Sequence, residues 1–393
     1  MRRLAELATL SDTPGGLTRL FLSTAHKRAV ALVDGWMQEA GLTTHVDAIG
    51  NLVGRKGTGK TLLLGSHIDT VRDAGWYDGN FGVLAAIEAV QAAGELPYAL
   101  EIIAFGDEEG VRFPQTLSGA RAVAGTFDPA ALHGRDADGI TMGEALAAFG
   151  GNPGGIAAVA RQPADILGYI ELHIEQGPVL EAEQIPVGVV TAINGASRFA
   201  VVVTGEAGHA GTVPMPMRRD ALAAAAEMVL AVEAIGRATP ELVATVGALA
   251  VHPGAPNSVP GVVKFTIDIR APLDAARHEA VLAITNAFDR IAGSRNVDLS
   301  MTQTHDAQAV SCSVRLREFL AAAVKANGIV PRFLPSGAGH DSMAVADLCP
   351  VAMLFVRCKG GISHTPEESI TPEDAQTAVA VLVEFLRKFK NDH

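Results

Sequence analysis

The chain has 393 residues, of which 48% are hydrophobic and only 5% aromatic, and its formal net charge is −12. This length and apolar content predict one large or two moderate globular domains and exclude a disordered chain. The acidic surface repels phosphate backbones, so we expect no nucleic-acid partner.

The first part of the chain alternates predicted helices and strands. Apolar residues at helical spacing predict a helix over 17–41, and the apolar runs 61–65 and 100–105 predict strands buried on both faces. A helix over 79–93 joins these two strands. Strand, helix, strand is the α/β pattern, in which ligands bind at the carboxyl ends of the strands.

Residues 195–310 carry a different order of elements and interrupt the first domain, which we therefore predict to comprise 1–194 and 311–393. The inserted segment reads strand, helix, strand, strand, helix, strand, which is a ferredoxin-like split motif. Its predicted elements are 197–204, 218–236, 243–251, 262–270, 273–292 and 297–304. The first domain resumes with a helix to residue 326, a strand over 351–356 and a helix over 372–389.

Two features of the sequence bear on location and on a possible nucleotide site. Three widely spaced cysteines, no signal-peptide pattern and no membrane-length apolar run predict a cytoplasmic protein without a membrane partner. Residues 54–61 match the phosphate-binding pattern G-x-x-x-x-G-K-T but lead into a buried strand instead of a helix. A glycine-rich turn is therefore the favoured interpretation, and ATP binding is disfavoured.

Polar residues follow both buried strands. His67 and Asp69 end the first strand, and Glu108 and Glu109 follow the second. A structural histidine is the usual explanation of a lone His-x-Asp, but a metal ligand whose second N–H is held by Asp69 fits a strand end. Adjacent carboxylates repel each other unless a cation compensates, and a solvated acidic loop is the alternative.

Three further residues complete a candidate metal set. Asp78 precedes Gly79 at a helix start, where it could cap the helix or bridge two cations. His173 and His364 lie in similarly polar segments. Imidazoles, a bridging carboxylate, a terminal carboxylate and a spare carboxylate as base suit metal-assisted hydrolysis of an amide-like bond.

The inserted domain and the turn at 337–341 add candidate binding residues. His209 stands among small residues, which suggests close approach of a substrate or of another molecule. Arg270 could clamp a carboxylate or form a rim salt bridge, and Asn257 lies in the same domain. The turn that holds His340 could line the pocket or be an ordinary loop.

Taken together, the motifs resemble the dinuclear-metal aminoacylase and carboxypeptidase superfamily. Within it the chain is similar to the branch that contains allantoate amidohydrolase, N-carbamoyl-L-amino-acid hydrolase and β-ureidopropionase. The resemblance covers essentially the whole chain and rests on GSHIDT (65–70), YDG (77–79), DEEGVRF (107–113), ELHIEQGP (171–178), GHAGT (208–212), SGAGHD (336–341) and SH (363–364). It implies a mixed-sheet metallopeptidase-like catalytic domain with an inserted ferredoxin-like domain that acts as lid and dimerises.

The resemblance also implies a role for each candidate. Two divalent ions per subunit, Zn²⁺ or Mn²⁺, would be bound by His67 and His173 and by Glu109 and His364, with Asp78 as bridge. Glu108 would be the general base, Asp69 would be a further catalytic residue, and a cis peptide bond would follow Asp78. His209 would reach the partner's active site in a homodimer and stabilise the oxyanion. Arg270 and Asn257 would hold the substrate carboxylate, also across the dimer, and Gln176 and His340 would contact substrate.

The resulting prediction is an amidohydrolase that cleaves the ureido C–N bond of a linear ureido acid. Allantoate, with release of ammonia and carbon dioxide, is the first expectation, and N-carbamoyl-L-amino acids or β-ureidopropionate are the alternative. A dipeptidase or aminoacylase is more remote. A non-catalytic scaffold is disfavoured because every expected ligand and the base are present.

Overall fold

The computed structural model describes residues 1–390 and consists of two compact units. The first unit comprises Met1–Thr191, Cys312–Leu334 and the chain from Ala338 onward, and the second comprises Ala192–Ser311 with Pro335–Gly337. No helix within residues 1–390 has the length and apolar character needed to cross a membrane.

The first unit is built around a mixed β-sheet, and its strands β6 and β15 run across the unit's boundary. In chain order its helices and strands are α1 (Arg2–Ala8), α2 (Thr24–Glu39), β1 (Thr43–Val46), β2 (Leu52–Lys56), β3 (Thr61–His67), α3 (Asn80–Ala93), β4 (Ala99–Phe105), α4 (Ser118–Ala124), α5 (Met142–Phe149), β5 (Ile166–Ile174), α6 (Val179–Ala182), β6 (Val187–Ile193), α9 (Val314–Ala326), β15 (Phe333–Ser336), α10 (Ser342–Val345), β16 (Val351–Val356) and α11 (Pro372–Lys388).

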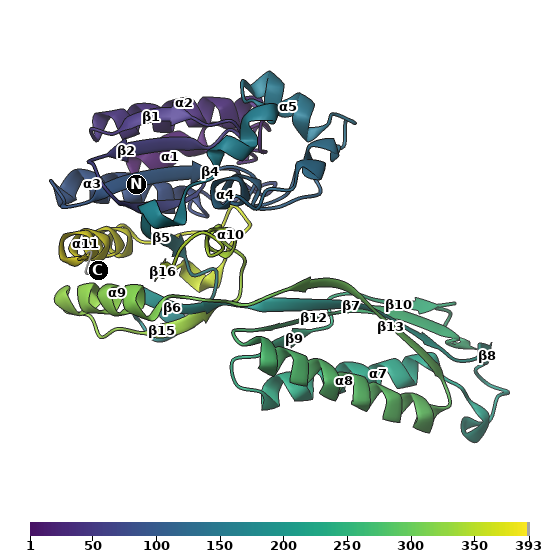
Figure 1. Cartoon of the computed structure of the whole chain (residues 1–393). Coiled ribbons are helices and arrows are strands. Elements are labelled where there is room, and N and C mark those ends of the chain that lie inside the picture. The colour runs from purple at the N-terminus through teal and green to yellow at the C-terminus, as the bar shows by residue number, and fades with distance from the viewer. Residues whose placement is uncertain (391–393) are drawn as a thin grey trace. The chain divides into compact units, whose positions relative to one another are not determined.

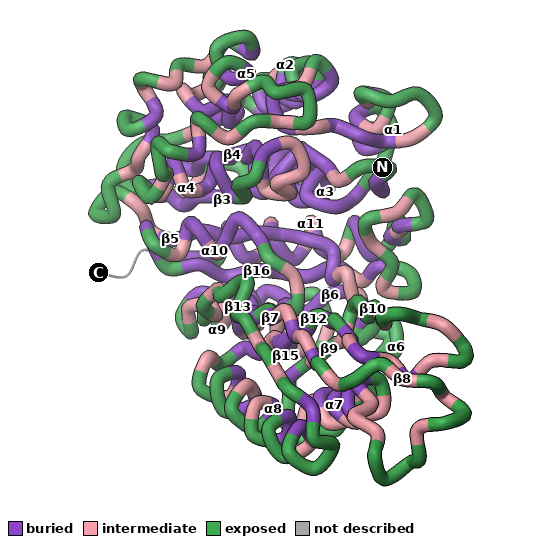
Figure 2. The backbone as a smooth tube through the Cα atoms, turned by 90° about the vertical axis from the view of Figure 1, so that its right-hand side faces the viewer, coloured by how far each residue is buried: buried purple, intermediate pink, exposed green. Residues whose placement is uncertain are grey.

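The strand order places four parallel strands in the centre of this sheet. The order is β1-β2-β4-β3-β5-β16-β6, and β4, β3, β5 and β16 run parallel to one another. Every residue of β3, β4 and β16 is buried (Figure 2). Strands covered on both faces need continuous apolar runs, which these sequences supply. Their four carboxyl ends therefore meet at one edge of the sheet.

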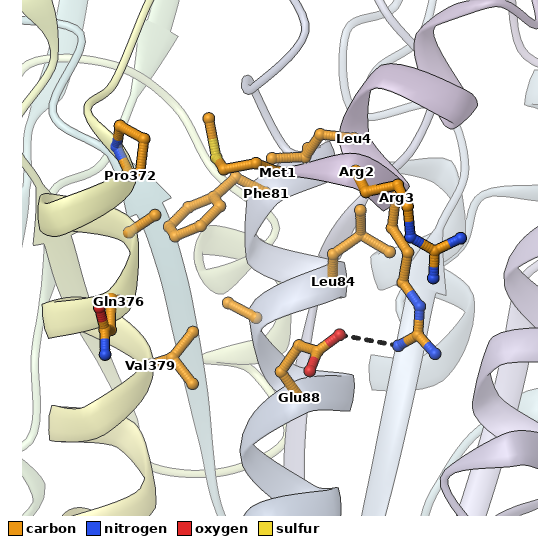
Figure 3. Close-up of a pocket in the computed structure, with 12 residues that line it drawn as sticks. Met1, Arg2, Arg3, Leu4, Phe81, Leu84, Glu88, Pro372, Gln376 and Val379 are labelled. Atoms are coloured by element: carbon orange, nitrogen blue, oxygen red, sulfur yellow. Dashed lines mark hydrogen bonds and ion pairs between the residues drawn. The ribbon is translucent and has the colours of Figure 1, made fainter.

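Helices α3 and α11 pack against this sheet and against each other. Helix α11 begins with the Thr371 hydroxyl accepting the Asp374 N–H, and Pro372 occupies its first turn, where no N–H is needed. A cavity of about 540 Å³ lies between α1, α3 and α11. Figure 3 shows its apolar floor, which includes Phe81, and its rim, where Arg3 pairs with Glu88 at 2.8 Å. The cavity contains none of the candidate site residues.

The second unit is a smaller sheet with two helices. Its elements are β7 (Gly195–Thr204), β8 (Gly208–His209), α7 (Ala221–Ala238), β9 (Val243–Thr245), β10 (Leu249–His252), β11 (Ser258–Val259), β12 (Val262–Ala271), α8 (Asp274–Arg295), β13 (Asp298–Ala307) and β14 (Val310–Ser311). The antiparallel order β10-β12-β7-β13 places the long strands β7 and β12 in the middle. Helices α7 and α8 cover one face of this sheet (Figure 1).

Burial alternates along the strands of the second unit. In β12 the odd-numbered residues from Val263 to Ile269 are buried against the helices, and the even-numbered residues point to the other face. Among the described residues of this unit, no helix covers that other face. In β12 this face carries charged and hydroxyl side chains.

Two predicted elements differ from the structure. The helix expected from residue 17 begins at Thr24, because the Ser23 hydroxyl accepts the His26 N–H and caps it there. The strand expected over 243–251 is divided into β9 and β10. Thr245 pairs with Asp268 and Leu249 with Phe265, so residues 246–248 face only residues 266 and 267. This is a β-bulge, and Gly247 lies within it.

Candidate metal centre

Five candidate ligands lie where the central parallel strands end. His67 is the last residue of β3, and His173 is the second-last residue of β5. Glu109 follows β4, and His364 follows β16. Asp78 lies in the loop between β3 and α3. With Glu108, these side chains form three groups whose ligand atoms lie within 4.8 Å of one another. The groups are His67, Asp78 and His173; His67, Glu108 and Glu109; and Asp78, Glu109 and His364.

The carboxylate of Asp78 lies between the histidines. Its Oδ1 is 3.4 Å from His67 Nε2 and 3.0 Å from His173 Nε2. Its Oδ2 is 3.3 Å from His364 Nε2, and Glu109 Oε2 lies 3.9 Å from the same nitrogen. Each oxygen of one carboxylate therefore faces a different group of ligands, which is the arrangement that a bridging carboxylate between two cations requires.

The tautomers of two histidines are fixed by backbone carbonyls. His67 Nδ1 lies 3.0 Å from the carbonyl oxygen of Asp69, and His173 Nδ1 lies 2.9 Å from that of Ile174. A carbonyl can only accept, so Nδ1 donates in both rings and Nε2 presents its lone pair to the site. The carboxylate of Asp69 lies 3.9 Å from His67 Nδ1, an ion-pair distance, while the hydrogen bond of Nδ1 goes to the main chain of the same residue.

The Asp69 carboxylate also holds the backbone of Glu108 and of its neighbour Glu109. Its two oxygens accept the backbone N–H groups of Glu108 and Glu109, each at 3.3 Å. Asp69 is buried, so both bonds are shielded from water. The Glu108 side chain then lies with Oε2 3.9 Å from His67 Nε2. Asp69 is thus a positioning residue for the two consecutive glutamates.

The peptide bond after Asp78 is trans, contrary to the prediction. Within residues 1–390 the only cis bond is His252–Pro253. Gly79 turns the chain with φ +63°, which a residue without Cβ adopts at little cost, and a non-proline cis bond costs about 3–4 kcal/mol. A Cβ at Gly79 would lie 2.4 Å from His67 Nε2, so the glycine also makes room for the ligand ring.

The electrostatics of the site favour cations. Burial, together with the charge of Asp78, raises the pKa of Glu109 to about 7. Burial also raises the pKa of Glu108 well above its usual range, and His67 only partly offsets this. The opposite holds for Asp78, whose pKa lies well below its usual range because three surrounding imidazoles outweigh its burial. Crowded, buried carboxylates next to imidazoles are a donor set that suits Zn²⁺ or Mn²⁺.

Access to the site is uneven. The side chains of His67 and His173 are each 2% exposed, whereas that of His364 is 51% exposed. Solvent and small molecules therefore reach the group around His364 first.

Gln176 and two residues that the sequence did not reveal surround Asp78. Gln176 Nε2 donates to Asp78 Oδ2 at 2.7 Å, and Ser363 Oγ lies 2.9 Å from the same oxygen. Glu368 accepts the backbone N–H groups of Tyr77 and Asp78 with Oε1 and meets Ser363 Oγ with Oε2 at 2.8 Å. The acidic pair 367–368 just after the S-H-T-P segment is the one sequence signal that could have indicated Glu368.

A second buried carboxylate, Glu171, joins the strands that carry the histidines. It accepts from Ser66 Oγ at 3.1 Å and from both the N–H and the hydroxyl of Ser342. Ser66 precedes His67, and Ser342 follows the turn that holds His340. The His340 ring is buried and packs edge-on at 4.4 Å from the His173 ring, so it lies beside the ligands.

The remaining candidates lie in the second unit. His209 and Asn257 are exposed and adjacent, since β8 pairs with β11 and Ala210 N–H donates to the Asn257 carbonyl. Arg270 is near the other end of β12, where it forms two hydrogen bonds with Asp268 and one with the Gly337 carbonyl. The structure therefore brings His209 and Asn257 together but separates them from Arg270 by most of the length of a strand.

With this geometry described, the chain can be compared with known proteins. The model of peptidase family M20/M25/M40 matches residues 63–388. The chain belongs to this family. It is 43% identical to a probable allantoate deiminase of Oryza sativa subsp. japonica, over 98% of this chain and 87% of that protein. It is 42% identical to an N-carbamoyl-L-amino acid amidohydrolase of Geobacillus stearothermophilus, over 97% and 95%.

The solved structures agree with this placement. An amidase of the hydantoinase/carbamoylase family from Burkholderia multivorans has a TM-score of 0.92 and 35% identity, covering 98% of this chain and 95% of that one. The predicted superfamily and the mixed α/β sheet are thereby confirmed. The curated relatives are hydrolases of carbon–nitrogen bonds outside peptides, as the sequence predicted for this chain.

Proposed function

We propose that this protein is a two-metal amidohydrolase that cleaves the ureido C–N bond of a linear ureido acid, with allantoate as first candidate and N-carbamoyl-L-amino acids as second. The observation that carries the proposal is the Asp78 carboxylate with imidazoles at both oxygens. A relative named for allantoate is 43% identical to this chain, and a relative named for N-carbamoyl-L-amino acids is 42% identical. The comparisons therefore support both candidates equally.

The donor set fits two divalent ions. His67 and His173 would hold one, Glu109 and His364 the other, and Asp78 both. When bound, the ions would supply Lewis-acid polarisation of the ureido carbonyl and would lower the pKa of water at the site.

Glu108 is the residue best placed to move protons. Its carboxylate reaches the ligand group with Oε2 but is not needed in either ligand set, and its backbone is fixed by Asp69. A carboxylate whose pKa is raised by burial can accept a proton from water and later deliver it to the leaving nitrogen. Ammonia and carbon dioxide would then be the small products from an unsubstituted ureido group.

A homodimer is part of the proposal, and the geometry of the second unit supports it. Residues 262–270 of β12 separate the His209 end of the sheet from Arg270, a span of about 26 Å at ~3.3 Å per residue. A small ureido acid cannot contact both ends of one sheet. Arg270 and the pair His209 and Asn257 of one subunit would therefore contact different substrate molecules, and a homodimer provides two. His209 would there stabilise the oxyanion.

We also propose that the second unit acts as the lid, and that the protein works in the cytoplasm. Cys312, Cys349 and Cys358 are all buried free thiols, which suits a reducing compartment.

The test is ammonia release from allantoate and from N-carbamoyl-L-amino acids by protein reconstituted with Mn²⁺ or Zn²⁺. Turnover by the wild type and none by Glu108→Ala would support the mechanism, and the better substrate would decide between the two candidates. Dipeptides and N-acetyl amino acids serve as negative substrates. Turnover of those alone, or equal activity of Glu108→Ala, would refute the proposal.

A further inference from the structure

A buried arginine joins the N-terminal segment to the loops that carry candidate metal ligands. Arg19 lies in the first unit, between α1 and α2, and is fully buried. Its guanidinium makes four hydrogen bonds: Nε donates to the Ile68 carbonyl at 2.7 Å, Nη1 to the carbonyls of Leu7 and Leu10 at 2.8 and 3.1 Å, and Nη2 to Asn80 Oδ1 at 2.6 Å. These acceptors come from three separate parts of the chain, so the side chain acts as a cross-link.

Two of these bonds reach segments that hold candidate ligands. Ile68 follows His67 directly, and its carbonyl belongs to the peptide group that leads to Asp69. The carbonyl of Asp69 in turn lies 3.0 Å from His67 Nδ1. Asn80 is the first residue of α3 and follows Asp78 by two residues. The guanidinium therefore ties the end of β3, which places the His67 ring, to the start of α3, which places the Asp78 carboxylate.

The backbone of Arg19 strengthens the same connection. The Arg19 N–H donates to Thr70 Oγ1 at 2.9 Å, and the Thr70 N–H donates to the Arg19 carbonyl at 3.0 Å. The next residue, Val71, donates its N–H to Glu109 Oε1 at 3.2 Å. The segment 67–71 is thus held by Arg19 and itself contacts a further candidate ligand.

Capping of helix α1 is the alternative explanation for this residue. Leu7 lies in the last turn of α1 and Leu10 comes just after the helix, and carbonyls at a helix end need donors from elsewhere. Nη1 alone meets that need. The bonds from Nε and Nη2 go to other parts of the chain, so a cap does not explain them. Only a planar fork of donors holds all three places at once.

The charge of Arg19 also suits this position. Burial lowers the pKa of its guanidinium to about 10, although the nearby carboxylates of Asp69 and Asp12 raise it, so the group is a cation at neutral pH. Asp69 accepts the backbone N–H groups of Glu108 and Glu109. Buried charges are costly unless opposite charge and hydrogen bonds compensate them. Arg19 therefore stabilises the carboxylate that holds this pair of glutamates.

We propose that Arg19 is a positioning residue for the metal centre, holding the end of β3 and the start of α3 so that His67 and Asp78 meet at the same ion. His67 Nε2 and Asp78 Oδ1 are 3.4 Å apart, and a shift of either segment would change that spacing. The inference rests on the two-metal site of the proposed function and on neither candidate substrate. Since the family model matches residues 63–388, it assigns part of the metal site to a segment outside that match.

The experiment measures metal binding by chelator-treated, folded protein. Mn²⁺ binding is followed by isothermal titration calorimetry, and Co²⁺ binding by its visible absorption, which reports the coordination of the ion. Arg19→Met keeps the apolar length of the side chain and removes every donor. Loss of a residue that orients metal ligands typically weakens metal binding by about 10–100-fold, so we expect Arg19→Met to raise the Kd of at least one ion by that factor and to change the Co²⁺ spectrum.

Arg277→Met is the matched control. The Arg277 side chain is also fully buried, but it lies in α8 of the second unit, where it pairs with Asp274 at 2.8 Å and with Asp306. Both variants should lower Tm, because each removes a buried, hydrogen-bonded guanidinium. Only Arg19→Met should weaken metal binding, and the Kd values of Arg277→Met should stay within about 3-fold of those of the wild type, well below the usual effect of an orienting residue.

Two further variants separate positioning from stability. Arg19→Lys keeps the charge but gathers its donors on one nitrogen, so a loss of metal affinity smaller than that of Arg19→Met is expected. Asn80→Ala leaves Arg19 and its bonds to Leu7 and Leu10 in place and removes only the acceptor at the start of α3. It should weaken metal binding measurably, and circular dichroism verifies that each variant is folded.

The outcomes distinguish this inference from the proposed function. Unchanged Kd values in folded Arg19→Met would overturn the inference, and so would equal weakening in Arg277→Met, because lost stability alone would then explain the effect. If Arg19→Met does not fold, unchanged Kd values in Asn80→Ala overturn it. A wild type that binds two ions but hydrolyses no ureido acid would remove the proposed function and leave this inference standing. A wild type that binds no ion would remove both.

Discussion

Replacing Asp69 by Asn tests whether one buried carboxylate positions Glu108 and Glu109 for the proposed hydrolysis. In the wild type each oxygen of Asp69 accepts one backbone N–H, from Glu108 and from Glu109. Asn keeps one acceptor and turns its NH₂ toward the other N–H, which leaves a buried donor unpaired. Such a loss costs about 1–3 kcal/mol, and both wild-type bonds are long at 3.3 Å, so about 2 kcal/mol is expected.

If that free energy appears in the placement of Glu108 and Glu109, kcat/KM falls by about 30-fold, since each 1.36 kcal/mol is tenfold. The assay is steady-state ureido hydrolysis beside metal analysis of the purified variant. Asp47→Asn is the matched control, because Asp47 Oδ1 accepts three backbone N–H groups in the turn before β2. Asp47→Asn should lose stability while retaining activity per folded molecule. Wild-type kcat/KM and metal content in Asp69→Asn would refute the reasoning.

Three further predictions concern pH, packing and metal. His26 is buried, and burial together with Arg19 and Arg112 lowers its pKa to about 3. In the unfolded chain the pKa of this histidine is about 6.5, so its contribution to the free energy of unfolding is fully present above that pH. As the pH falls, the unfolded chain binds the proton first, and ~2 kcal/mol of stability is lost at pH 5. Urea midpoints at pH 7.5 and 5 should therefore differ less in His26→Asn than in the wild type. Gly79→Ala places a Cβ 2.4 Å from His67 Nε2 and should abolish metal retention, whereas Gly94→Ala, with φ +81° and no atom within 4 Å, should lose only stability; equal metal content in the two variants would contradict this. Adding Mn²⁺ or Zn²⁺ to chelator-treated protein should raise Tm as the metal concentration rises. The free energy of unfolding should increase by ~2.7 kcal/mol for each site at a hundred times its Kd, and this gain should shrink in His173→Ala.

The positions of the candidate metal ligands follow from local sequence because strand ends are visible in it. The apolar runs before His67 and Glu108 predict buried parallel strands, and the carboxyl ends of such strands meet at one edge. Ordered motifs then add His173, His364 and Asp78. For these residues, local pattern and tertiary arrangement agree, so the sequence was sufficient to predict where they lie.

The supporting residues depend on contacts that no local pattern contains. Glu368 holds the backbone of Tyr77 and Asp78 from the far end of the chain, and the acidic pair 367–368 does not show which backbone it binds. The Asp69 carboxylate could bind either the nearby imidazole or the next loop, and only the fold decides between them. The same holds for the bulge at Gly247, which depends on pairing with β12.

The position of β16 has a consequence for how the protein is made. This strand is inserted between β5 and β6, although it follows them by more than 150 residues in the chain, and His364 comes only after it. While the ribosome is still translating the segment before residue 351, β5 and β6 each lack a neighbour and one metal ligand does not yet exist. Final closure of the sheet and loading of the metal centre therefore belong to the last stage of biogenesis, and the nascent chain must be guarded from strand-edge aggregation until then.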